Sequence, residues 1–196
     1  MRLAYFLQGI LFLGIVLIAV YAMQAKEQPD DSAIMNEKSD MSLSLASPAF
    51  EQNARIPSKY TCDGDRSINP PLAFSGVPEG AKSLALIMDD PDVPKVLHAD
   101  GVFDHWVLFN IPPATREIAE GGSVGTAGAN GAGGNTYYGP CPPPQYEPSE
   151  HRYIFVLYAL DTELPLKEGA AKQEVLKAME GHIIEQAQLV GKYKRI

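Results

Sequence analysis

Polar side chains stand at one end of each of three apolar segments in this sequence. The first segment runs into Asp89–Pro94 (DDPDVP), the second opens at Asp104–His105, and the third opens at His151–Tyr153 (HRY). Burying such groups costs free energy unless each finds a partner. Their recurrence at segment ends therefore indicates a shared polar site rather than three unrelated positions.

The spacing of these residues predicts that their side chains converge. Side chains alternate along a β-strand, so His151 and Tyr153 face the same way. If the three segments are neighbouring strands, Asp90 and His105 lie close to both. Imidazole and phenol groups donate hydrogen bonds to anionic oxygens, and a nearby carboxylate orients a histidine and favours its charged form. The pattern favours a pocket for a phosphate monoester or a similar anion.

Two other interpretations use the same residues. Each histidine could be a satisfied core residue, with Asp90 capping a turn before proline. A metal site is the second alternative, but no HExxH motif or EF-hand loop is present, so we expect no metal. The side chains that a metal would use are Asp89, Asp90, Asp92, His98, Asp100, Asp104 and His105.

The sequence gives little support for catalysis. It has no GxSxG motif, and Cys141 lies between prolines without a helix N-terminus to lower its pKa. The Gly-rich segment 128–135 (GANGAGGN) lacks the Lys-Ser/Thr pair of a phosphate-binding loop. We therefore expect a binding protein without a cofactor, not an enzyme.

Cys62 and Cys141 are the only cysteines. In an oxidising compartment they form a natural pair, and a bridge over so long a loop stabilises a fold by about 4 kcal/mol in the chain-entropy model. Two free, buried thiols are the alternative. We expect the bridge.

Strands must position the polar groups. Strands are expected at 43–50, 83–90, 105–112 and 151–161, where short apolar runs end at Pro, Gly or charged residues. Residues 120–135 show no regular pattern.

A helix is expected over 171–194 because apolar residues recur there at helical spacing. These residues are Val175, Met179, Ile183, Ala187 and Val190. Strands followed by a helix favour a mainly antiparallel sheet with peripheral helices.

The N-terminal region is expected to lie outside this domain. Met1-Arg2 precedes an uncharged apolar run, so residues 1–25 predict a signal peptide or an N-terminal membrane anchor. Residues 26–41 are acidic and polar and predict a flexible linker. Either reading places the domain, 42–196, in the periplasm or at the cell surface.

The length and net charge of the chain argue against some classes of binding partner. The 196 residues fit one domain plus an extension, and the net charge of −8 argues against nucleic acid and against a polybasic membrane patch. A membrane contact is expected only through the N-terminal segment.

Five stretches together resemble the phosphatidylethanolamine-binding protein family, also called the Raf kinase inhibitor protein family, and most closely its bacterial and archaeal branch. They are KYTCDG with NPPLAFSGVPEGAKSLAL; DDPDVP; FDHWVLFNIP; YYGPCPPP followed by HRYIFVLYALD; and GAAKQEVLKAMEGHIIEQAQLVGKY. They occur in the family's order and cover about Ser42 to Lys194.

The resemblance implies a large central antiparallel sheet packed on a smaller sheet, with peripheral helices. It also implies a pocket that accepts phosphate-like and carboxylate head groups. Carried over by position, the ligand-binding residues are Asp90, Pro94, His105, Gly139, Pro140, His151 and Tyr153.

The expected function is extracytoplasmic binding of a small anion or phosphorylated head group. The alternative is a protein inhibitor or regulator of a secreted hydrolase or kinase, with the pocket anchoring a chain terminus of the partner. A small-ester hydrolase is a third possibility, without an evident nucleophile.

Overall fold

The structure, a computed structural model, describes residues 42–195. Its strands are β1 (Ser44–Ala46), β2 (Leu72–Ser75), β3 (Ser83–Asp90), β4 (Phe103–Ile111), β5 (Glu117–Ile118), β6 (Thr126–Ala127), β7 (His151–Leu160) and β8 (Ile183–Tyr193). A short 3₁₀ helix, η1 (Ser58–Tyr60), and one α-helix, α3 (Lys172–Met179), complete the described elements. The expected signal peptide or anchor (1–25) and linker (26–41) lie outside these residues. Within 42–195, no helix is both long and apolar enough to cross a bilayer.

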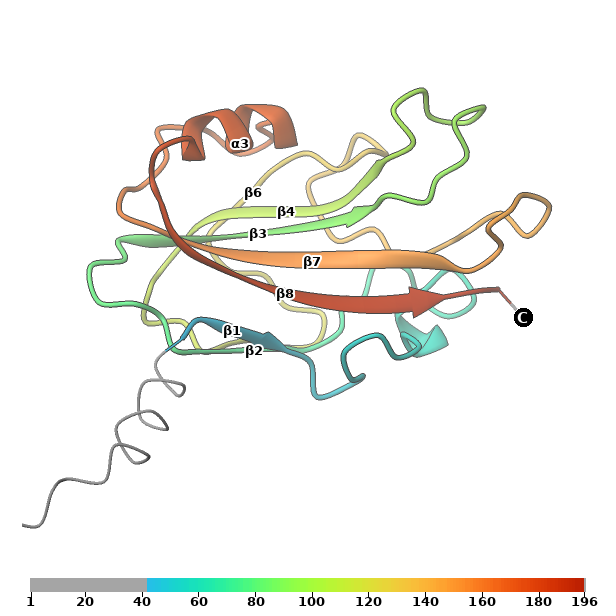
Figure 1. Ribbon diagram of the computed structural model, residues 1–196, viewed down its shortest axis with the longest axis horizontal. Coiled ribbons are helices and arrows are strands. Elements are labelled where there is room, and N and C mark those ends of the chain that lie inside the picture. Colours follow the sequence, from blue (N-terminus) through green and yellow to red (C-terminus); the bar gives the residue numbers. More distant parts are fainter. Residues whose placement is uncertain (1–41, 196) are drawn as a thin grey trace, which may run out of the picture. The chain divides into compact units, whose positions relative to one another are not determined.

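Two antiparallel sheets form the molecule. The larger has the order β6-β4-β3-β7-β8, and the smaller has the order β1-β2-β5. Figure 1 shows the small sheet packed on one face of the large sheet and α3 on the other face. The mainly β fold expected from the sequence is therefore confirmed.

The central strand β3 is buried on both faces, which explains its continuous apolar sequence. Leu84, Leu86 and Met88 belong to the core between the two sheets. Ala85 and Ile87 belong to a second core, which includes the buried face of α3. This alternation continues to the end of the strand, so Asp89 and Asp90 face opposite sides of the sheet.

The helix expected over 171–194 is wrong in its second half. The helix ends at Met179, Gly181 adopts a positive φ of 78°, and β8 begins at Ile183. β8 pairs with β7 along its whole length. The apolar spacing of four residues fits a helix, but it also keeps side chains on one face of a strand, where the period is two. The spacing therefore does not distinguish the two structures.

The sequence does not predict three of the shorter strands. β2, β5 and β6 lie in segments that lack an apolar pattern, and two of them are only two residues long. The strands expected at 83–90, 105–112 and 151–161 correspond to β3, β4 and β7. The expected strand at 43–50 is ordered as strand only at Ser44–Ala46.

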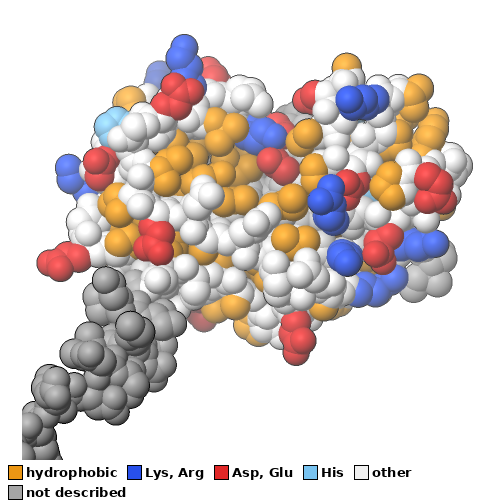
Figure 2. Space-filling model, viewed as in Figure 1, with side chains coloured by type: hydrophobic (Ala, Val, Ile, Leu, Met, Phe, Trp, Pro, Cys, Tyr) orange, Lys and Arg blue, Asp and Glu red, His pale blue; other side chains and the backbone are white. Residues whose placement is uncertain are grey.

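The charged side chains lie mainly toward the edges of the visible surface. Figure 2 shows several basic side chains gathered at the lower right of the face in view, with acidic side chains among them. The expected lack of a nucleic-acid partner stays a prediction.

A buried ion cluster fastens α3 to the sheet. The Lys172 side chain is 7% exposed, and its Nζ lies 3.1 Å from Asp89 Oδ1. The same ammonium pairs with Asp104, the residue opposite Asp89 in the β3–β4 ladder. Burial raises the pKa of Asp89 to about 6, although the attraction of Lys172 acts in the other direction.

Lys172→Met should therefore destabilise the protein by about 2 to 4 kcal/mol, because two neighbouring carboxylates lose the cation that pairs with them. Urea unfolding at pH 7 measures the free energy of unfolding. Lys177→Met is the matched control, since Lys177 is an exposed residue of the same helix. Equal stability of the two variants would show that the cluster does not hold the helix.

Candidate functional site

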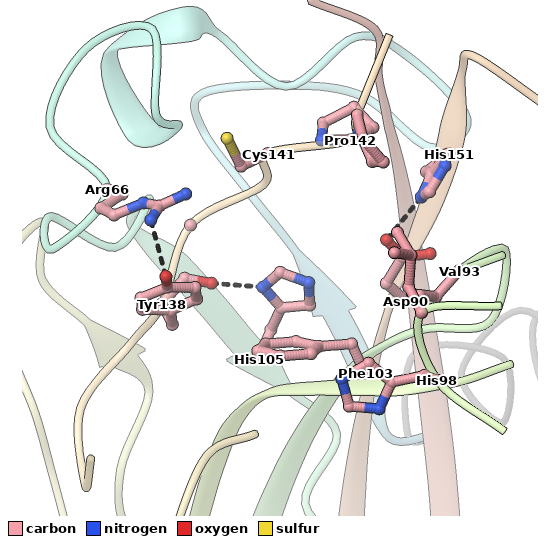
Figure 3. Close-up of a pocket in the computed structure, with 13 residues that line it drawn as sticks. Arg66, Asp90, Val93, His98, Phe103, His105, Tyr138, Cys141, Pro142 and His151 are labelled. Atoms are coloured by element: carbon pink, nitrogen blue, oxygen red, sulfur yellow. Dashed lines mark hydrogen bonds and ion pairs between the residues drawn. The ribbon is translucent and has the colours of Figure 1, made fainter. Parts of the chain in front are cut away.

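A pocket of about 300 Å³ opens at one end of the large sheet, where β3 ends and β4 and β7 begin. These three strands are neighbours in the order β4-β3-β7, as the convergence argument requires. The pocket is lined by Arg66, Asp90, Val93, Leu97, His98, Phe103, His105, Tyr138, Gly139, Cys141, Pro142, Pro143 and His151 (Figure 3).

A β-bulge turns His105 into this pocket. Met88 pairs with Trp106, but the next residue, Asp89, pairs with Asp104, so His105 is an extra residue in β4. Without the bulge, strict alternation would place His105 with Val107 beneath the helix. A bulge of this kind re-aims one side chain at the end of a ladder.

His105 has a fixed hydrogen-bonding polarity. Its Nδ1 bonds the carbonyl oxygen of Tyr138, and a carbonyl only accepts, so Nδ1 carries the proton. Burial lowers the pKa of His105 to about 4, which leaves the ring neutral near pH 7. The lone pair of Nε2 is then an acceptor. This differs from the expectation that both imidazoles donate to an anion.

Asp90 and His151 form a buried pair. Asp90 Oδ2 lies 2.7 Å from His151 Nδ1, and the two side chains are 4% and 1% exposed. The second oxygen of Asp90 accepts the backbone N–H of Asp92 at 2.9 Å. Each carboxylate oxygen thus accepts one hydrogen bond and keeps capacity to accept another. The other ring nitrogen of His151, Nε2, is buried and has no hydrogen-bond partner among residues 42–195.

Tyr153 lies beneath the pocket rather than in its lining. Its ring packs edge-on against His105, with ring centroids 5.1 Å apart. Burial, reinforced by the nearby charge of Asp90, raises the pKa of Tyr153 well above its usual range. Its hydroxyl is also buried without a partner in the described part of the chain.

Gly139 lines the pocket as expected, whereas Pro94 and Pro140, also expected to bind the ligand, are not among the lining residues. The Pro94 carbonyl accepts the N–H groups of Leu97 and His98, which form part of the rim. The Pro140 carbonyl accepts the N–H of Cys62 at 3.0 Å. Gly139 has to be glycine, because a Cβ there would lie 2.4 Å from the Tyr60 carbonyl oxygen.

The expected bridge between Cys62 and Cys141 is present, with the two Cα atoms 5.3 Å apart. It joins the loop after η1 to the segment that carries Gly139. The disulfide therefore links two pocket walls that are 79 residues apart in sequence.

Arg66 is the charged residue of the pocket lining that the sequence did not predict. It reaches the site from the loop after η1. Its backbone carbonyl accepts the Gly139 N–H at 2.7 Å, which fixes this loop against the pocket rim. Its Nη1 donates to the Tyr138 hydroxyl at 2.6 Å. A lone arginine in an acidic loop (DGDRS) gives no periodic signal, so only the folded loop reveals its position.

The acidic residues considered for a metal have other partners. Asp92 accepts three hydrogen bonds from Arg152, which hold its pKa low, and Asp89 and Asp104 pair with Lys172. Across residues 42–195, no three His, Cys, Asp or Glu side chains are grouped to hold a metal ion.

Comparison with known proteins shows the family of this chain. Residues 46–194 match the family model described as phosphatidylethanolamine-binding protein. The chain belongs to the phosphatidylethanolamine-binding protein family. It is 47% identical to a UPF0098 protein of Chlamydia pneumoniae, over 78% of this chain and 99% of that protein. A UPF0098 protein of the archaeon Methanothermobacter thermautotrophicus is 49% identical, with the same coverage of both chains.

Solved structures of the family share the fold. The crystal structure of a putative homologue from Chlamydia trachomatis is 44% identical and superposes with a TM-score of 0.75, covering 80% of this chain and 99% of that chain. E. coli YbcL superposes with a TM-score of 0.69 at 24% identity, covering 79% and 99%, and supports the fold alone.

The tautomer assignment predicts the titration of His105. Its ring should stay in the neutral Nδ1–H form from pH 8 down to about pH 5, because its pKa lies near 4 in the folded protein against 6.5 in the unfolded chain. The unfolded state then binds the proton first. Stability from this group is complete above pH 6.5 and falls as the pH drops towards 4. Long-range ¹H–¹⁵N NMR of the histidine rings measures the tautomer and the pKa of His105. A His105 signal that titrates between pH 6 and 7 would contradict the assignment.

Proposed function

We propose that this protein binds a small anionic or phosphorylated molecule in the pocket at the ends of β3, β4 and β7. One observation carries the proposal. Within 42–195, three buried side-chain polar atoms have no hydrogen-bond partner: Arg66 Nε, His151 Nε2 and Tyr153 Oη. All three residues line or underlie this one pocket. Buried polar atoms in native proteins are normally paired, so a ligand that supplies partners fits this site.

The chemistry supports binding rather than turnover. The Asp90 carboxylate is committed to His151 and to a backbone N–H, and Cys141 is committed to the disulfide. No lining side chain is a nucleophile paired with a base. Asp90 orients His151, His151 Nε2 contacts the ligand, and His105 contributes its Nε2 lone pair.

A protein partner is the second candidate function. Val96 and Leu97, on the loop that forms one rim, are 76% and 49% exposed. Exposed apolar side chains beside a polar pocket favour contact with another molecule. Such a partner would be a secreted hydrolase or kinase that places a chain terminus in the pocket.

We further propose an extracytoplasmic location. The apolar run within residues 1–25 is typical of a secretory signal or anchor. The Cys62–Cys141 bridge fits the same compartment, because disulfides persist outside the reducing cytosol.

His151→Asn tests the pocket. An Asn amide reproduces the Nδ1 position and retains the bond to Asp90, but it lacks Nε2. We expect at least a tenfold loss of affinity for phosphoethanolamine by isothermal titration calorimetry, in line with about 1.4 kcal/mol or more for a contact to a charged group. The control is His182→Asn. His182 makes the same contact with Asp161 at 2.8 Å, but the two side chains are 45% and 55% exposed. Unchanged affinity of His151→Asn for phosphoethanolamine would contradict the proposed function.

Cell fractionation and intact-mass measurement test the location. The protein should appear in the extracytoplasmic or membrane fraction, and alkylation under denaturing conditions should modify neither cysteine before reduction and both after it. A cytosolic protein with two free thiols would contradict the proposed compartment.

A further inference from the structure

Arg66 stands at one side of the pocket with its charge uncommitted. Its guanidinium carbon lies 4.3 Å from the centroid of the Tyr138 ring, and its Nη1 donates to the hydroxyl of the same ring. Arg66 also lines a second, more open hollow, which both cysteines of the disulfide line as well. The side chain is therefore fixed in place between two open spaces.

No carboxylate in the described part of the chain lies within ion-pair distance of Arg66. The neighbouring cations differ: Arg152 pairs with Asp92 at 2.6 Å, and Arg195 pairs with Asp63 at 3.1 Å. The Nε of Arg66 is buried and lacks a partner. A half-buried guanidinium that lines a cavity and pairs with no carboxylate among the described residues is suited to an anion from outside.

The opposite side of the pocket offers acceptors. Figure 3 shows Arg66 and the Asp90–His151 pair on opposite sides, with His105 between them. Asp90 carries a negative charge there, and His105 presents the lone pair of Nε2. A bare anion placed against these groups would be repelled, whereas a hydroxyl or ammonium group would be bound.

The rim segment 140–144 offers few backbone N–H groups that could bind an anion in place of Arg66. Residues 140–144 read PCPPP, so Cys141 supplies their single backbone N–H. An anion in this pocket must be held mainly by side chains, and Arg66 is the lining side chain with a permanent positive charge.

We propose that Arg66 holds the anionic group of the ligand, and that the pocket selects molecules that carry a hydrogen-bond donor beside that group. This inference rests on the proposed function and deepens it. It predicts that phosphoethanolamine and inorganic phosphate bind, since both carry donors, and that sulfate, which has none near pH 7, binds weakly.

Calorimetric titration of the full chain with phosphoethanolamine, inorganic phosphate and sulfate tests the proposal. Arg66→Gln should weaken both phosphate ligands by about tenfold to a hundredfold, the range for losing a charge-assisted contact. Arg66→Lys should recover most of the affinity. Arg116→Gln, the matched control on an exposed loop, should bind as wild type, because the Arg116 side chain is not part of the pocket lining and donates to the nearby Pro113 and Thr115 carbonyls. NMR of the His105 ring, unchanged in Arg66→Gln, would show that the pocket is intact.

Each outcome separates the two proposals. If Arg66→Gln binds as wild type while His151→Asn does not, the role of Arg66 is wrong and the proposed function stands. If neither variant loses affinity, both proposals fail. Equal losses in Arg66→Gln and Arg66→Lys, with a displaced His105 signal, would make Arg66 a structural residue and overturn the inference. Sulfate binding as tightly as phosphate would overturn the proposed ligand class.

Discussion

A buried carboxylate at the end of β3 constrains the whole site. Asp90 is 3% exposed, and its burial is tolerable only because His151 and a backbone N–H occupy its two oxygens. That requirement places the start of β7 beside the end of β3 and fixes the plane of the His151 ring. The second nitrogen of the same ring is buried and has no hydrogen-bond partner among residues 42–195. The placement of the polar groups at this end of the pocket thus depends on the contact between Asp90 and His151.

Charged residues that stabilise the fold and polar residues at the pocket lie on opposite faces of the large sheet. Asp89 and Asp104 face α3, where Lys172 neutralises them within the fold. Asp90 and His105 face the pocket, where the described residues leave several polar atoms without partners. Adjacent residues in β3 thus serve different purposes because side chains alternate along a strand. The bulge in β4 extends this separation to Asp104 and His105, which are also adjacent in sequence.

Much of this arrangement could be predicted from the sequence, for identifiable reasons. β3 and β7 are long, apolar and bounded by polar residues, so both were found, and the alternation within HRY placed His151 and Tyr153 on one face. The sequence of β8 predicts a helix because apolar residues four apart satisfy both periodicities. The bulge at His105 and the position of Arg66 depend on pairing between distant segments, which no local pattern encodes. The polarity of His105 depends on the Tyr138 carbonyl, 33 residues away.

The central claim is that an anion supplies the partners that the buried atoms around this pocket lack. A high-resolution crystal structure of the protein with phosphoethanolamine tests it most directly. The account predicts phosphate oxygens within hydrogen-bond distance of Arg66, the amine near Asp90 and His105, and a ligand or water partner for His151 Nε2. A phosphate bound elsewhere, or a pocket in which the protein's own side chains satisfy these atoms, would contradict it.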